Sequence, residues 1–152
     1  MASKIVFECA KILMDKKLTI AFAESATAGR LSAEFSLVPN CGGTLKGGIV
    51  CYDAGVKQEV LGVPQELVET YTPESAEVTR ELAQRLQNFM KTDIQVAVTG
   101  LTMPGGSETP EKPVGTMFVH TIIKGKPIAL REVYHGTPKK LFYKRWIGWR
   151  NY

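Results

Sequence analysis

A carboxylate and two hydroxyls stand close together in the stretch AFAESATAGRLSAEF, where Glu24, Ser25 and Thr27 lie between an apolar run and a helical pattern. A serine at such a strand-to-helix junction can present its hydroxyl beside the unpaired backbone N–H groups of the helix start. Those N–H groups suit an oxyanion or a phosphate. The alternative is that Ser25 or Thr27 is an ordinary helix N-cap. The residue pattern alone leaves both interpretations open.

A base must lie near this serine for its hydroxyl to be a good nucleophile. The segment CYDAGVK offers Tyr52 and Lys57, whereas His120 falls inside a strand pattern and His135 near a turn. A lysine can act as the base when burial lets its amine be neutral at about pH 7. Taken alone, Lys57 also fits a solvated helix lysine, and Tyr52 fits an aromatic at the edge of the core.

The stretch TGLTMPGGSETPEKPVGT is a third candidate, because four glycines and three prolines fall between Gly100 and Gly115. Such a composition indicates a loop with imposed backbone geometry that can approach a ligand closely. It matches neither the phosphate-binding P-loop nor the dinucleotide fingerprint. Glu111 and Lys112, enclosed by prolines, are either held in a fixed position or form a solvated salt pair. A loop of this length favours a functional role.

The elements that position these groups follow from apolar spacing. This spacing predicts a first helix over 4–16 with Ser3 as its N-cap, and a long helix over 73–91 that Pro73 opens. One face of the long helix carries the apolar residues Val78, Leu82, Leu86 and Phe89. The other expected elements are a helix to about residue 36, two short helices within 55–71, and strands over 18–23, 45–52, 93–100, 114–123 and 128–135.

Helices that alternate with strands and end in a hairpin predict an α/β fold. We expect a three-layer α/β/α sandwich whose sheet is mostly parallel, with one antiparallel member. Ligands of such sheets collect at the carboxyl ends of the strands. The three polar segments each follow a predicted strand, so they should converge there.

The composition is that of one soluble globular domain covering residues 1–152, with 44% hydrophobic and 22% charged residues. A net charge of +4 is compatible with a phosphorylated ligand and does not require nucleic acid. Cys9, Cys41 and Cys51 have no metal-ligand spacing and predict reduced thiols in a cytoplasmic protein. Cys41 could be a lone nucleophile, while Cys9 and Cys51 fit buried small apolar residues. No apolar run has membrane-spanning length.

The motifs AESATAG, GGIVCYDAGVKQEVLGVP, ESAEV, VAVTG and PGGSETPEKPVGT occur in the order and spacing of the CinA C-terminal domain family, so the chain resembles that family over roughly residues 4–135. The family includes the nicotinamide-nucleotide amidases. The resemblance implies an α/β/α fold and hydrolysis of the carboxamide of nicotinamide mononucleotide. The products would be nicotinic acid mononucleotide and ammonia, in pyridine nucleotide salvage. It implies a small nucleotide substrate and neither a metal nor an organic cofactor.

The resemblance also implies roles for individual residues. Its catalytic positions are Ser25, Lys57, Tyr52 and Thr27. Its substrate-binding positions are Glu24, Gly29, Thr99, Gly100, Pro104, Gly105, Gly106, Glu111 and Lys112. In this scheme Ser25 attacks the carboxamide carbon, Lys57 takes the serine proton, and the glycine-rich loop holds the ribose phosphate.

The chain departs from the family pattern at several site positions. Alanines replace a cysteine and a glycine at Ala26 and Ala28, and Asp-Ala-Gly at 53–55 replaces Ser-Asn-Glu. Met103 replaces a glycine, and the pair Ser-Glu at 107–108 lengthens the loop. These departures leave a second hypothesis, a catalytically impaired relative that acts as a nucleotide-binding or partner-binding module.

The tail departs as well, because six basic and six aromatic residues lie among residues 131–152. Phe142, Trp146 and Trp149 share helical spacing. We therefore expect this face to pack on the domain or on a second subunit, as in a homodimer, rather than to bind nucleic acid. We expect no membrane partner.

Overall fold

A computed structural model of the chain describes residues 2–135, so the predictions for Phe142, Trp146 and Trp149 lie outside the described residues. The elements in chain order are α1 (Lys4–Asp15), β1 (Ile20–Glu24), α2 (Arg30–Ser36), the 3-10 turn η1 (Cys41–Gly43), β2 (Leu45–Val50), α3 (Ala54–Glu59), α4 (Gln65–Tyr71), α5 (Ala76–Phe89), β3 (Ile94–Gly100), β4 (Thr116–Ile123) and β5 (Lys126–Val133).

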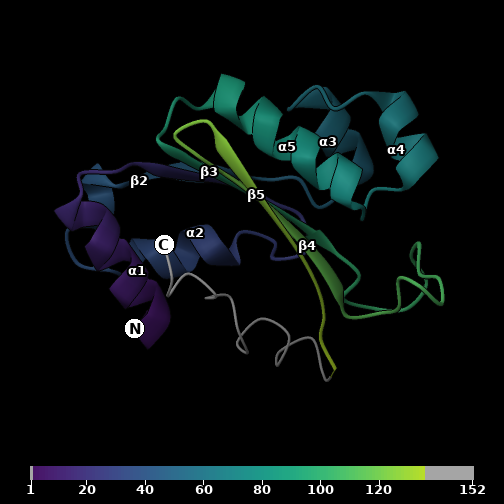
Figure 1. The fold of residues 1–152 in the computed structure, drawn as a ribbon, viewed down its shortest axis with the longest axis horizontal. Helices are drawn as coiled ribbons and strands as arrows, with labels where there is room; N and C mark the ends of the chain where they lie inside the picture. Colours follow the sequence, from purple (N-terminus) through teal and green to yellow (C-terminus); the bar gives the residue numbers. More distant parts are fainter. Residues whose placement is uncertain (1, 136–152) are drawn as a thin grey trace.

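The strands form one sheet in the order β2-β1-β3-β4-β5. β1 runs parallel to both β2 and β3, while β4 is antiparallel to β3 and to β5. Helices α1 and α2 cover one face of this sheet, and α3, α4 and α5 cover the other (Figure 1). The prediction of a three-layer sandwich with one strand running against the rest is therefore confirmed.

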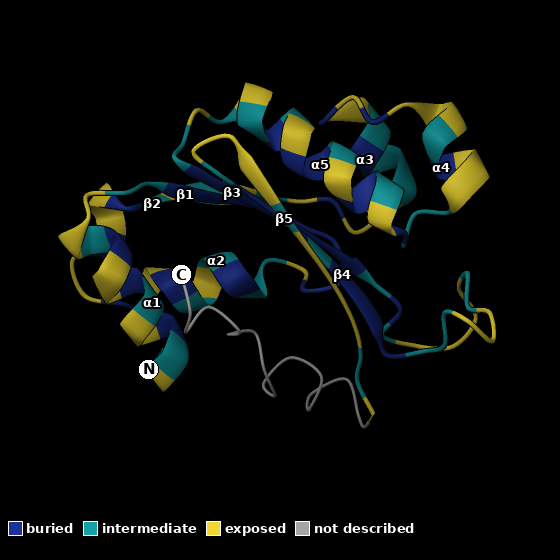
Figure 2. Cartoon of the chain, in the orientation of Figure 1, coloured by how far each residue is buried: buried dark blue, intermediate teal, exposed yellow. Residues whose placement is uncertain are grey.

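Each face of the sheet has its own apolar core. The core below α1 and α2 includes Phe22 and Val96, and the core below α5 includes Ala23, Leu82 and Leu86. Each fully buried leucine contributes roughly 1.5–3 kcal/mol relative to an exposed one. The central strands β1 and β3 are buried almost throughout, whereas most of the edge strand β5 is exposed (Figure 2). β1 and β3 therefore lie in the most buried part of the sheet.

The helix predictions are confirmed in part. Ser3 caps α1 by accepting a hydrogen bond from the Val6 N–H at 3.4 Å. The long helix begins at Ala76 and not at Pro73, because the Ser75 hydroxyl accepts the Val78 N–H at 3.2 Å and makes Ser75 the N-cap.

The predicted apolar face of α5 is correct except at its end. Val78, Leu82 and Leu86 are fully buried, as that face requires. Phe89 is 57% exposed although its spacing matches theirs, so the prediction was wrong there. It is the last residue of the helix, and spacing alone does not reveal whether the sheet extends below the last turn.

The amino ends of β1 and β3 are fastened to each other. The Asp93 carboxylate accepts hydrogen bonds from both the N–H and the hydroxyl of Thr19, each at 2.8 Å. These hydrogen bonds lower the pKa of Asp93. The contact fixes the register of the two parallel strands and therefore the relative positions of their carboxyl ends.

Candidate active site

The alternation of side chains along β1 sends its last residues to opposite faces of the sheet. Ala21 and Ala23 belong to the core below α5, whereas Phe22 belongs to the core below α1 and α2. The period of two continues to Glu24, which reaches α2. The same period places Ser25, one residue beyond the strand, on the side of α3 and α5.

Glu24 caps α2. It is fully buried, and its carboxylate accepts the Leu31 N–H at 2.9 Å, the Ser32 N–H at 2.8 Å and the Ser32 hydroxyl at 2.7 Å. The N-cap position itself is Gly29, which has no side chain to do this. The interpretation of Ser25 or Thr27 as the helix cap is therefore wrong, and their hydroxyls are not used for that purpose.

The turn between Glu24 and α2 has an unusual backbone. Ala28 and Gly29 are both left-handed, with φ of +48° and +89°. The Ala28 N–H donates to the Ser25 carbonyl at 3.0 Å, which closes the turn. A left-handed φ strains alanine by about 1–2 kcal/mol and does not strain glycine.

The strain at Ala28 gives a stability prediction. Ala28→Gly should stabilise the protein by about 1 kcal/mol, because relief of the left-handed strain exceeds the entropy that glycine adds to the unfolded chain. Gly29→Ala is the matched control and should destabilise it, since a Cβ there would lie 3.1 Å from Val50 Cγ2 at φ +89°. Urea unfolding of both variants measures the change in the free energy of unfolding. A loss of stability in Ala28→Gly would contradict the assignment of strain.

Lys57 is fully buried in α3, so the interpretation as a solvated helix lysine is wrong. Its ammonium donates to the carbonyls of Cys51 at 2.8 Å, Tyr52 at 3.1 Å and Asp53 at 3.5 Å. Burial lowers the pKa of Lys57, and the negative charges of Glu74 and Asp53 oppose that shift. A lysine in this position can lose its proton more easily than one in water.

Three strand ends meet around Ser25. The Ser25 N–H donates to the Val98 carbonyl at 3.0 Å, and the Cys51 N–H donates to the Glu24 carbonyl at 2.8 Å. The carbonyl of Cys51 in turn accepts the Lys57 ammonium. The structure therefore brings the turn that contains Ser25 beside the segment that holds Lys57. Tyr52 follows β2 at the same edge of the sheet, and its 62% exposure means that it does not pack at the edge of the core as the alternative interpretation expected.

Two threonines add hydroxyls at this edge. The Thr27 hydroxyl is buried and has no hydrogen-bond partner among the described residues. Thr99 and Thr79 share a hydrogen bond of 2.7 Å, and the Thr79 hydroxyl donates to the Ser75 carbonyl at 2.5 Å. Because Thr79 has a single proton, Thr99 must be the donor of the shared bond. Sequence reasoning missed Thr79, whose only signal was its place in the first turns of the longest helix.

The glycines of the loop over 101–115 and its flanks have different roles. A Cβ on Gly100 would lie 2.8 Å from the Thr116 carbonyl, so this glycine serves the pairing of β3 with β4. A Cβ on Gly106 would lie 3.0 Å from Leu101 Cδ2. Gly105 is left-handed and has open space around it, and the neighbouring Pro104 is exposed. Gly105 is therefore the glycine with room beside its backbone for a ligand.

Lys112 is directed away from solvent, and the alternative of a solvated salt pair with Glu111 is wrong. Its ammonium donates to the Thr72 hydroxyl at 2.6 Å, the Glu74 carbonyl at 2.9 Å and the Ser107 hydroxyl at 2.9 Å. Glu111 is exposed, and its backbone carbonyl accepts a hydrogen bond from Arg131. Partial burial lowers the pKa of Lys112, against the charges of Glu74 and Glu77. No sequence pattern indicated that Thr72, Glu74 and Ser107 would be the partners of Lys112.

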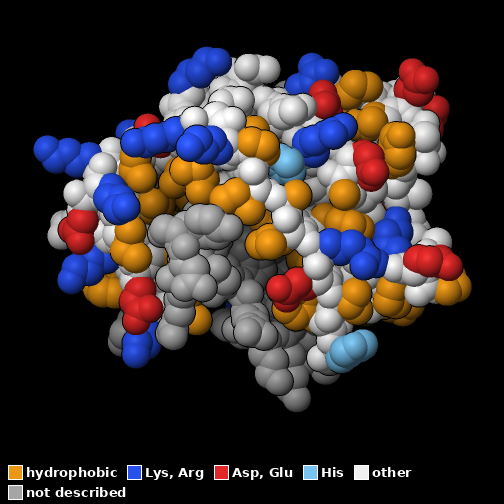
Figure 3. Space-filling model, in the orientation of Figure 1, with side chains coloured by type: hydrophobic (Ala, Val, Ile, Leu, Met, Phe, Trp, Pro, Cys, Tyr) orange, Lys and Arg blue, Asp and Glu red, His pale blue; other side chains and the backbone are white. Residues whose placement is uncertain are grey.

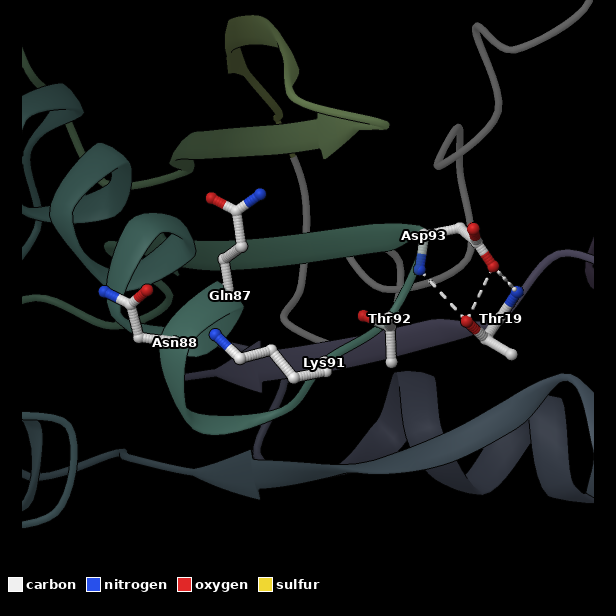
Figure 4. Close-up of a pocket in the computed structure, with 6 residues that line it drawn as sticks. All are labelled: Thr19, Gln87, Asn88, Lys91, Thr92 and Asp93. Atoms are coloured by element: carbon white, nitrogen blue, oxygen red, sulfur yellow. Dashed lines mark hydrogen bonds between the residues drawn. The ribbon is translucent and has the colours of Figure 1, made fainter.

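A shallow pocket of about 380 Å³ lies at the opposite end of the sheet (Figure 4). Its lining is Thr19, Gln87, Asn88, Lys91, Thr92 and Asp93. The polar groups of Thr19 and Asp93 are engaged with each other, and the pocket lies at the amino ends of β1 and β3. In a parallel sheet the carboxyl ends form the ligand edge, so we place the candidate site at Ser25 and not in this pocket.

Three further features of the described residues bear on other kinds of site. On the face in Figure 3, basic side chains are spread among acidic ones and do not gather in one patch. No helix within residues 2–135 is long and apolar enough to cross a membrane. In the same part of the chain, no three His, Cys, Asp or Glu side chains come together as a metal site.

The sequence profile of the CinA C-terminal domain family matches residues 2–144. A CinA-like protein from Gemmatimonas aurantiaca is 34% identical over 144 residues, which cover 95% of this chain and 32% of that protein. A CinA-like protein from Dictyoglomus thermophilum is 39% identical over 115 residues, which cover 76% of this chain and 28% of that protein. The chain thus spans about a third of the length of the curated relatives it matches.

Solved structures share the fold. The crystal structure of a competence or damage-inducible protein from Enterobacter asburiae has a TM-score of 0.83 and 26% identity, over 91% of this chain and 89% of that one. A competence/damage inducible protein from Agrobacterium tumefaciens has a TM-score of 0.85 and 24% identity, over 93% of this chain and 88% of that one. Together these matches support the three-layer architecture described above.

Proposed function

This chain belongs to the CinA C-terminal domain family, and on that premise we propose that it hydrolyses the carboxamide of nicotinamide mononucleotide to nicotinic acid mononucleotide and ammonia. The observation that carries this proposal is that Lys57 is buried close to the serine turn. Its ammonium donates to the Cys51 carbonyl, and the Cys51 N–H donates to the carbonyl of Glu24, the residue before Ser25. In this arrangement the Ser25 hydroxyl is the nucleophile, and the buried Lys57 amine is the base near it.

The reaction proceeds through an acyl-serine. Ser25 Oγ attacks the carboxamide carbon while the Lys57 amine accepts the serine proton, and the backbone N–H groups that follow Ser25 stabilise the oxyanion. Collapse of the tetrahedral adduct breaks the C–N bond, and Lys57 returns the proton to the leaving ammonia. Water, deprotonated by the same amine, then attacks the ester, frees Ser25 and releases the carboxylate product.

Lys57 can take this role because its hydrogen bonds are unequal. A neutral amine keeps two N–H groups and gains one lone pair. Those two N–H groups retain the shorter contacts, to Cys51 at 2.8 Å and Tyr52 at 3.1 Å. Only the weak 3.5 Å contact to Asp53 is lost. Deprotonation therefore leaves the side chain anchored to Cys51 and Tyr52, and the new lone pair takes the place of the donor to Asp53. To accept the serine proton, the amine must turn this lone pair from the Asp53 carbonyl toward Ser25.

The unpartnered Thr27 hydroxyl supports a bound polar substrate in this turn. A buried hydroxyl without a partner is destabilising by about 1–3 kcal/mol, and a ligand that supplies the missing hydrogen bond removes that penalty. Thr27 is 4% exposed, so it cannot be satisfied by bulk solvent in the folded protein. We assign it to substrate orientation, two residues from the nucleophile.

The test is ammonia release from nicotinamide mononucleotide by the purified protein, measured at about pH 6 to 9. The rate should rise with pH, because the neutral form of Lys57 is the base, and the midpoint should lie below the ordinary lysine pKa of 10.5 since burial lowers it. Protein that binds the nucleotide but releases no ammonia would instead support the catalytically impaired relative.

Removal of the Asp53 charge tests whether Lys57 is the group whose titration sets the pH dependence of the rate. The Asp53 carboxylate raises the pKa of Lys57, so Asp53→Asn should move the rising limb of the pH–rate profile to lower pH. Asparagine can keep the cap of α3, in which the Asp53 side chain accepts the Gly55 N–H at 2.7 Å. Asp15→Asn, at the exposed end of α1, is the control and should leave the limb in place. An Asp53→Asn limb at unchanged or higher pH would contradict this assignment.

A further inference from the structure

The glycine-rich loop is hydrogen-bonded to the connection between α4 and α5 by one polar cluster, which we call the loop anchor (Thr72, Glu74, Ser107 and Lys112). The Ser107 hydroxyl donates to the Glu74 carboxylate at 2.7 Å and accepts from the Lys112 ammonium at 2.9 Å. Lys112 also reaches the Thr72 hydroxyl and the Glu74 carbonyl. These contacts join two segments that are 33 to 40 residues apart in the chain.

The hydrogen bonds of the loop anchor are mutually consistent. The single proton of Ser107 goes to the carboxylate, so its oxygen can only accept from the ammonium. Ser107 thus bridges a cation and an anion, and each hydrogen bond is charge-assisted. The Lys112 ammonium uses its three donors on three protein oxygens, which leaves none for a substrate phosphate. This arrangement favours a positioning role for Lys112 over direct substrate binding.

Two of the stabilising contacts come from the residues that lengthen this loop relative to the family pattern. Ser107 bridges Glu74 and Lys112, and Glu108 accepts the Gly105 N–H at 2.7 Å. At the base of the loop, the Gly115 N–H donates to the Leu101 carbonyl at 2.7 Å. The added residues Ser107 and Glu108 therefore form hydrogen bonds of their own that hold the lengthened loop.

We propose that the loop anchor, through Ser107 and Glu74, fixes the glycine-rich loop at the carboxyl edge of the sheet and so determines how tightly the nucleotide is held. The identity of the bound nucleotide rests on the proposed function. The fixing of the loop by the loop anchor does not depend on it. The negative charge of Glu74 also favours the protonated form of both Lys57 and Lys112. The carboxylate thus lies within electrostatic range of the proposed base as well as of the loop.

Hydrogen–deuterium exchange tests the structural part without any activity. In Lys112→Met, the backbone amides of Gly105 and Thr109 should exchange about tenfold faster, as the loss of charge-assisted hydrogen bonds implies. Ser107→Ala should accelerate them in the same direction, and the double variant should add little, because both changes remove one cluster. The amides of β3 should keep their rates, and Lys11→Met, on the exposed face of α1, is the control. Unchanged loop exchange in both single variants would overturn the proposal.

Steady-state kinetics test the functional part. With nicotinamide mononucleotide, Ser107→Ala and Lys112→Met should raise KM about tenfold and leave kcat within about twofold, because the loop holds substrate and takes no part in bond making. Equal KM in the variants and the unmodified protein, or loss confined to kcat, would overturn the positioning role. If the unmodified protein releases no ammonia, the proposed function fails, and the exchange experiment alone still decides whether the loop anchor exists.

Discussion

Ser25→Ala protein should release ammonia from nicotinamide mononucleotide slower than the unmodified protein by a factor on the order of 10⁴ to 10⁶. The reason is chemical, since the Ser25 hydroxyl is the group that forms the acyl bond. The folded structure should tolerate the change, because Ser25 is held by its backbone N–H and carbonyl. Nucleotide affinity should therefore stay within about twofold of the unmodified protein.

The control for this experiment is Ser36→Ala, which removes an exposed hydroxyl in the last turn of α2 that bonds only locally, to the Ala33 carbonyl. It should keep full activity. Residual turnover in Ser25→Ala above about one per cent would mean that another nucleophile or a directly activated water does the chemistry. In that case the acyl-serine mechanism is wrong even if the substrate is correct.

Lys57→Met should reduce ammonia release nearly as much, by about 10³-fold or more. Methionine has almost the same length as lysine, so it fills the buried space without supplying a base. The carbonyls of Cys51 and Tyr52 lose their donor, which is destabilising, but the chain no longer has to bury an ammonium, which offsets part of that loss. Activity should therefore fall far more than stability.

The double variant decides whether the two residues act as one unit. Ser25→Ala combined with Lys57→Met should be no slower than Ser25→Ala alone, because the base has no function without the hydroxyl it deprotonates. Additive losses would separate the two residues into independent roles. Lys11→Met should leave the rate unchanged and excludes a general effect of lost positive charge.

The sheet and its helices were predictable because their signal is local. Apolar runs marked the strands, and Val78, Leu82 and Leu86 marked the buried face of α5. Of the three segments predicted to converge, the serine turn and the Lys57 segment do meet, at β3, and this was predictable because parallel strands share a carboxyl edge. These inferences need only periodicity and the rules of chain topology.

The roles of single side chains were less predictable because they depend on contacts across the chain. Glu24 is a helix cap through residues seven and eight positions later, where the pattern suggested that a hydroxyl would cap. Lys57 is buried although helical lysines are usually solvated. It can be buried because three backbone carbonyls of the preceding loop accept hydrogen bonds from its ammonium. No spacing in the sequence reveals that Glu74 meets Ser107.

The strand order has a consequence for how the site forms during folding. The hairpin of β4 and β5 pairs residues a few positions apart, from Ile123 with Lys126 outward. The pairing of β1 with β3 instead joins Thr19 to Asp93, 74 residues away, and it closes a loop that contains four of the five α-helices described within residues 2–135. Contacts of such long range require a large loss of chain entropy before they stabilise anything.

Ser25 and Lys57 both lie inside that long segment, and Ser25 is held against β3 by its hydrogen bond to Val98. Partly folded chains that contain only the hairpin therefore have no assembled site. The proposed turnover should therefore appear during refolding only once β1 is paired with β3, and so later than the secondary structure of the hairpin.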